Sequence, residues 1–137
     1  MKTVIEKVLT RPGLIFVVDG LGAALSASIF LLLILLDYAH IFGIPKQVLL
    51  WLAVLPIGFA LFDLSCLVRE KFRTTSKIVV IAILNIGYCI LSMVLICFHM
   101  NSVTSIGWLY FVSEVILVLG LAIFELKVAK RLGSNPT

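Results

Sequence analysis

Long apolar stretches separated by short polar segments dominate the pattern of this chain. The pattern predicts four helices, at about residues 14–36, 48–68, 78–98 and 106–126. Each has about 20 residues, the length with which an α-helix crosses about 30 Å of hydrocarbon. We therefore expect an all-α protein with four membrane spans.

The connections between these spans are short, and Gly43 and Pro45 act as helix stops in the first of them. Short connections make consecutive helices antiparallel neighbours. We expect a single membrane domain over residues 1–137, an integral membrane four-helix bundle in antiparallel, up-down-up-down order. Ahead of the first span, apolar residues at helical spacing predict a short helix on the membrane surface, with Val4, Ile5, Val8 and Leu9 on its apolar face.

The basic residues predict the orientation of the chain. Ten of the eleven Lys and Arg fall on one side of the predicted membrane, and only Lys46 falls on the other. The ten are Lys2, Lys7, Arg11, Arg69, Lys71, Arg73, Lys77, Lys127, Lys130 and Arg131. Cytoplasmic segments carry an excess of Lys and Arg. We expect both termini in the cytoplasm, and a bacterial inner membrane as the location.

Composition narrows the classes of function. The chain is 62% hydrophobic and 13% charged, whereas a soluble domain is roughly 45–50% apolar and about 25% charged. The net charge of +4 comes from residues that flank the spans, so we expect no nucleic-acid partner. The three cysteines form no metal-binding spacing, and we expect no metal and no cofactor. No nucleotide-binding, zinc-protease or Ser-His-Asp motif occurs, so catalytic residues stay unknown and an enzyme is not favoured.

Three carboxyl groups lie inside apolar stretches: Asp19, Asp63 and Glu114. An acid at membrane depth is costly, and it is a functional-site hypothesis by default. Counting from the span midpoints at 1.5 Å per residue places Asp19, Asp63 and Asn85 in one layer about 5 Å thick, with Glu114 nearer the midplane. Small residues share the faces of these side chains, as in helix contacts within membranes. We expect one polar cluster, with Tyr88 and Tyr110 lining its cavity.

Three functions compete for this cluster. The first is binding or transport of a small cation, a proton or an amphiphilic ligand. The second is a structural or accessory subunit of a homo-oligomer or larger membrane complex, in which polar groups specify helix partners. The third is a membrane enzyme that uses Asp63 and Glu114 as an acid–base pair on a lipophilic substrate. We rank transport first, because three acids and Asn85 share one small bundle whose predicted spans contain no Lys or Arg.

Pro56 adds a backbone feature to the second span. A proline inside a helix has no N–H, so it frees a carbonyl group one turn earlier. Freed carbonyls at membrane depth line binding sites in transporters, but proline kinks also serve packing alone. The sequence favours the packing interpretation.

Overall fold

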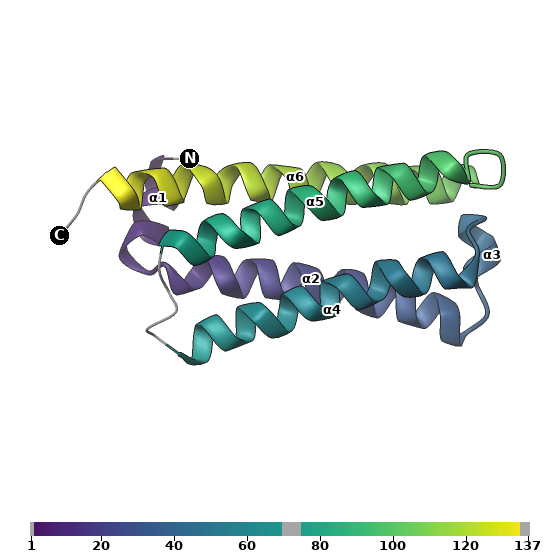
Figure 1. Cartoon of the computed structure of the whole chain (residues 1–137), viewed down its shortest axis with the longest axis horizontal. Helices are drawn as coiled ribbons and strands as arrows, with labels where there is room; N and C mark the ends of the chain where they lie inside the picture. Colours follow the sequence, from purple (N-terminus) through teal and green to yellow (C-terminus); the bar gives the residue numbers. More distant parts are fainter. Residues whose placement is uncertain (1, 70–74, 135–137) are drawn as a thin grey trace.

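The computed structural model describes residues 2–69 and 75–134, with side chains from residue 6 onward (Figure 1). Within these ranges it is entirely helical and contains no strand. The helices are α1 (Lys2–Thr10), α2 (Gly13–Leu35), α3 (Ala39–Phe42), α4 (Lys46–Val68), α5 (Thr75–Phe98) and α6 (Ser105–Ser134). Lys71 and Arg73 of the predicted basic loop lie outside the described residues, as do the side chains of Lys2, Val4 and Ile5.

Four helices, α2, α4, α5 and α6, are long and apolar enough to cross a membrane. The prediction of four apolar helices in a multi-pass membrane protein is therefore confirmed. Helix α6 differs most from its prediction, because it continues to Ser134, past the expected end at residue 126. Two shorter helices accompany the spans. One is α1, at the position of the predicted surface helix, and the other is α3, which the sequence did not indicate.

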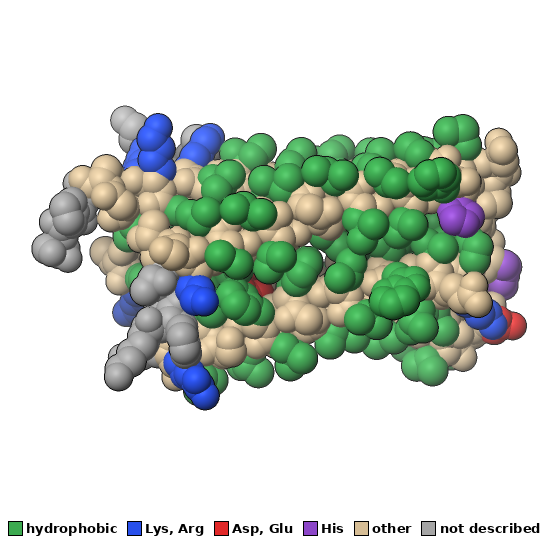
Figure 2. All heavy atoms as spheres, in the orientation of Figure 1, with side chains coloured by type: hydrophobic (Ala, Val, Ile, Leu, Met, Phe, Trp, Pro, Cys, Tyr) green, Lys and Arg blue, Asp and Glu red, His purple; other side chains and the backbone are tan. Residues whose placement is uncertain are grey.

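The four long helices form two closely packed pairs. Helix α2 packs along α4, and α5 packs along α6, whereas contacts between the pairs are fewer. Figure 1 shows these pairs as two layers, with α1 at one end of the molecule and α3 at the other. Apolar side chains cover the length of the bundle, and Lys and Arg gather at the α1 end (Figure 2). An apolar exterior with charged ends suits a molecule whose surrounding solvent is lipid.

The connection between α2 and α4 is built from special backbone positions. Asp37, just after α2, has a φ of 61°, and Gly43, just after α3, has a φ of 70°. Both lie in the left-handed region that ends helices, which glycine enters freely and Asp tolerates. Asp37 forms an ion pair with Lys46, the first residue of α4. The hydrogen bond from Lys46 and its positive charge hold the pKa of Asp37 below its ordinary value.

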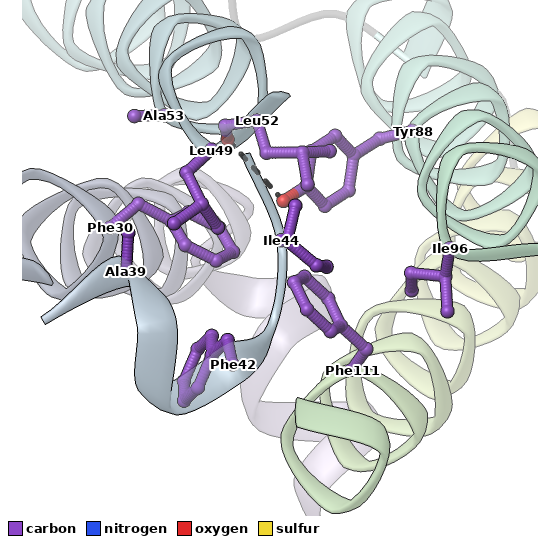
Figure 3. Packing of buried hydrophobic residues seen from close by; sticks show 10 residues of the cluster. All are labelled: Phe30, Ala39, Phe42, Ile44, Leu49, Leu52, Ala53, Tyr88, Ile96 and Phe111. Carbon is purple, nitrogen blue, oxygen red and sulfur yellow. Dashed lines mark hydrogen bonds between the residues drawn. The ribbon is translucent and has the colours of Figure 1, made fainter. Parts of the chain in front are cut away.

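Two buried apolar clusters occupy the two ends of the bundle. The α3-end cluster contains Phe30, Ala39, Phe42, Ile44, Leu49, Leu52, Ala53, Tyr88, Ile96 and Phe111 (Figure 3). The α1-end cluster contains Val8, Ile15, Phe16, Cys66, Ile78, Ile81, Val128 and Ala129. Every long helix contributes to both clusters, and the stretch between its two contributions carries a buried acidic or amide residue. The core is therefore apolar at both ends and polar in between.

We predict that Thr104 stabilises the α3 end of the molecule. Its hydroxyl accepts a hydrogen bond from the Gly107 amide at 3.1 Å, which caps α6, and it donates to the carbonyl of Ile41. Thr104→Val removes both bonds and should lower the free energy of unfolding by about 1–2 kcal/mol, in the range of helix-cap losses. Unfolding in detergent micelles measures the effect. Thr104→Ser keeps the hydroxyl and is the control, and an equal loss in both variants would contradict the capping role.

Candidate functional site

One polar side chain from each long helix lies in the middle of the bundle. Their exposed fractions are 4% or less, so all four are buried: Asp19 of α2, Asp63 of α4, Asn85 of α5 and Glu125 of α6. We call this set the polar layer. Asp19 and Asp63 come from one helix pair, and Asn85 and Glu125 come from the other. The layer therefore lies where the two pairs meet.

Asn85 connects the two pairs by hydrogen bonds. Its side-chain nitrogen donates to Oδ1 of Asp19 at 2.7 Å and to Oε2 of Glu125 at 3.4 Å. An amide NH₂ has two hydrogens, so it can serve both carboxyl groups at once. Both carboxyl groups are thereby attached to one neutral donor on α5.

Asp63 completes the layer from the opposite side. Its carboxyl group lies near those of Asp19 and Glu125. The close position of Asp63 depends on Gly20, because a Cβ atom at Gly20 would come within 3.2 Å of the Asp63 Cβ. Glycine at this position allows α2 and α4 to approach each other where their acids meet.

Four carboxyl oxygens of the layer have no hydrogen-bond partner in the described part of the chain. They are Oδ2 of Asp19, Oδ1 and Oδ2 of Asp63, and Oε1 of Glu125. None of these three acids forms an ion pair with a described Lys or Arg. A buried acceptor without a donor costs about 1–3 kcal/mol. The layer thus has more hydrogen-bond acceptors than donors, and a bound proton or other donor can offset this excess.

A cavity of about 40 Å³ adjoins the layer. Asp19 and Asn85 line it on one side, Tyr88 and Pro56 line it on another, and Ser26 is also part of its wall. Its volume exceeds the roughly 10–15 Å³ that a single water molecule needs. The cavity therefore provides a small space between the layer and Tyr88, with mostly apolar walls and a few polar side chains.

Glu114 lies outside the polar layer and belongs to a second group. The Tyr88 hydroxyl has Oε1 of Glu114 at 3.3 Å and the Leu52 carbonyl oxygen at 3.4 Å as acceptors. Leu52 precedes Pro56 by four residues, so its carbonyl is the group that Pro56 leaves without a helical partner. Figure 3 shows the Tyr88 side chain reaching from α5 to this carbonyl on α4. One hydroxyl hydrogen is shared between a backbone carbonyl and a buried acid.

The structure divides the residues that the sequence grouped into one cluster. Asp19, Asp63 and Asn85 meet in the polar layer, whereas Glu114 hydrogen-bonds Tyr88. Tyr110 packs against Phe30 and Phe42 and does not line the cavity beside the layer.

Glu125 was not among the predicted site residues. Its spacing of eleven residues from Glu114, close to three helical turns, puts both acids on one face of the fourth span. The predicted span ended at residue 126, so Glu125 was not counted among the acids at membrane depth.

The chemistry available to the polar layer is acid–base and electrostatic. Within residues 2–69 and 75–134, no group of three or more His, Cys, Asp or Glu side chains is arranged to hold a metal ion. The three acids offer sites for protons, and the Asn85 amide donates hydrogen bonds to two of them. Comparisons with protein-family models, curated proteins and solved structures found no match to this chain.

The shared Tyr88 hydroxyl predicts an energetic coupling to Pro56. Tyr88→Phe leaves the Leu52 carbonyl and Glu114 without this donor, and should lower the free energy of unfolding by about 1–3 kcal/mol. In a Pro56→Ala background, residue 56 regains an N–H for Leu52, so the same change should cost less. A double-mutant cycle of unfolding free energies in micelles measures the difference. Strictly additive effects would mean that Tyr88 does not serve this carbonyl.

The unpaired oxygens predict that Asp63 lowers stability. Asp63→Asn supplies two N–H donors beside Asp19 and Glu125 and removes one acid. We expect the free energy of unfolding at neutral pH to rise by about 1 kcal/mol, the usual net value of a buried hydrogen bond. Asn85→Leu is the opposing variant, because it removes the donor from both acids and should be destabilising. If Asp63→Asn has a lower free energy of unfolding than the unmodified chain, the unpaired oxygens of Asp63 do not lower stability.

Proposed function

We propose that this chain is a membrane protein that binds protons at the polar layer and moves them across the bilayer. The observation that supports this function most directly is the set of three buried acids with four unpaired oxygens and no basic partner among the described residues. Acids at membrane depth are typical of proton relays in pumps and transporters. A proton shared among facing carboxyl groups supplies both the missing donor and the missing positive charge.

A proton fits the layer better than a metal ion does. The described acids are not arranged as metal ligands, and the cavity beside them is small. The polar groups also continue beyond the layer, through the cavity between Asp19 and Tyr88 and on to Glu114. This sequence of titratable groups extends along the bundle toward the α3 end. It is the kind of arrangement along which protons move in steps.

The proposal includes a direction in the membrane. Lys and Arg gather at the α1 end of the molecule (Figure 2), and excess positive charge marks the cytoplasmic side. We place that end, and with it both termini, in the cytoplasm of a bacterium, with the four spans antiparallel in up-down-up-down order. The polar layer then lies in the cytoplasmic half of the membrane, and Glu114 lies nearer the midplane.

The enzyme hypothesis has less support from the same geometry. It needs Asp63 and Glu114 to act on one substrate as a pair. Asp63 faces Asp19 and Glu125, whereas Glu114 hydrogen-bonds Tyr88. A purely structural role uses the same Asn85 bonds and differs from proton transport in one respect, since it predicts no proton movement.

Proton flux into liposomes that contain the purified protein tests the proposal. An imposed membrane potential should drive a pH change inside the vesicles, read by an enclosed dye. Asp63→Asn should reduce this flux to the level of protein-free vesicles, because the layer loses an acid. The control is Asp37→Asn, which removes the exposed ion pair with Lys46 at the α3 end.

The flux assay is run at a pH at which Asp37 is ionised in the unmodified chain. Because its pKa is lowered, Asp37 contributes stability above its unfolded pKa and loses that contribution as pH falls through the folded value. Measurements above about pH 6 therefore keep Asp37 ionised in the unmodified chain, so its ion pair with Lys46 is present there and lost only in the control. Flux that is absent in the unmodified chain, or unchanged in Asp63→Asn, would refute proton transport by the layer and leave the structural role.

A further inference from the structure

The structure carries a second site, in a groove of about 480 Å³ between α2 and α6. The closest packing of α2 is with α4, and that of α6 is with α5, so the two helices leave a gap along part of their length. Volumes of about 300–1,000 Å³ are typical of small-molecule sites. The edges of the groove are apolar and exposed, with exposed fractions of 55% for Val18, 63% for Leu25 and 74% for Leu117. In a membrane these edges face lipid, so a ligand enters from the bilayer.

An acid lies in this otherwise apolar groove. Glu114 lines it and is 6% exposed, and its Oε2 has no hydrogen-bond partner among the described residues. The other oxygen, Oε1, is held by the Tyr88 hydroxyl. Ser26 and Tyr110 bring hydroxyl groups to the same groove, and no Lys or Arg lines it. The unpaired Oε2 of Glu114 is therefore an acceptor for a donor group of a ligand, and the two hydroxyl groups can donate or accept.

We propose that this groove binds a single-chain amphiphile with a protonated amine head, with the head at Glu114 and the alkyl chain along the apolar walls. The charge of Glu114 selects the amine, because a charge-assisted hydrogen bond is about twice as strong as a neutral one. The depth of Glu114, near the midplane of its span, selects one chain rather than a phospholipid, whose head group stays at the interface. Such a ligand satisfies the unpaired Oε2 and keeps its chain in hydrocarbon.

The groove also adjoins the polar layer. Gly22, Ser26, Val118 and Leu121 line both the groove and the cavity beside Asp19. The amphiphile site and the cavity beside the layer are therefore adjacent. The amphiphile site uses Glu114 and not Asp63, so a change at Asp63 leaves the groove itself intact.

Binding of decylamine, decanol and decanoate to the protein in phosphatidylcholine nanodiscs tests this site. The three probes share one alkyl chain and differ in the charge of the head, and the lipid contains no primary amine. Decylamine should bind at least about tenfold more tightly than decanol, equivalent to about 1.4 kcal/mol, and decanoate should bind most weakly. Glu114→Gln should reduce the preference for the amine to about twofold or less, because the charge is gone and the shape is kept.

A variant that fills the groove tests whether the probes bind there or in the surrounding lipid. A Cβ atom at Gly22 meets nothing within 4 Å, so Gly22→Leu fits the helix and fills the groove. It should weaken binding of both decylamine and decanol. Gly120→Leu, on α6 outside the groove and with equal room, is the matched control and should leave binding unchanged.

Each remaining outcome decides against the site. Equal binding of amine and alcohol to the unmodified chain would show an ordinary lipid-facing surface. An amine preference that survives Glu114→Gln, or binding that survives Gly22→Leu, would place the ligand elsewhere.

Proton flux distinguishes this site from the polar layer, because Asp63→Asn should abolish flux and keep amine binding. Misfolding of Glu114→Gln is detected by its unfolding midpoint, and Glu114→Asp, which keeps the charge, should then retain the preference.

Discussion

One neutral donor, the Asn85 amide, serves a buried acid from each of the two helix pairs. Most packing in this protein is within the pairs, α2 with α4 and α5 with α6. Apolar side chains gain little from associating in lipid, since lipid tails are equally apolar. Polar contacts such as the hydrogen bond from Asn85 to Asp19 and that from Tyr88 to the Leu52 carbonyl therefore help to specify how the pairs meet. The excess of acid around Asn85 is the same property that suits the layer to hold protons.

The long helices were predictable because length and hydropathy are local properties of the chain. The level of Asp19, Asp63 and Asn85 was also predictable, because residue count along a helix converts directly to depth. The depth of Glu125 was not predicted, because it depends on where α6 ends. Helix α6 continues to Ser134, past the predicted end of the span. The position of α3 depends on contacts between Thr104 and Ile41 that are 63 residues apart, and no local pattern indicates them.

The separation of Glu114 from the polar layer could not be read from depth alone. Both Glu114 and Glu125 lie on one face of α6, but their neighbours come from different levels of α5. Asn85 serves Glu125, and Tyr88, one turn further along, serves Glu114. The role of Tyr88 in turn follows from Pro56 on a third helix, whose missing N–H leaves the Leu52 carbonyl for the tyrosine. Sequence reasoning identified the freed carbonyl and could not identify the side chain that reaches it.

The arrangement in two pairs has a consequence for how the protein is made. The α2–α4 pair is complete in sequence before α5 is synthesised, so Asp19 and Asp63 enter the bilayer ahead of Asn85, the donor that Asp19 needs. Until the second pair is made, Asp19 therefore lacks this donor, and an acid without a partner in hydrocarbon is costly. Docking of the pairs then brings the Asn85 amide to Asp19.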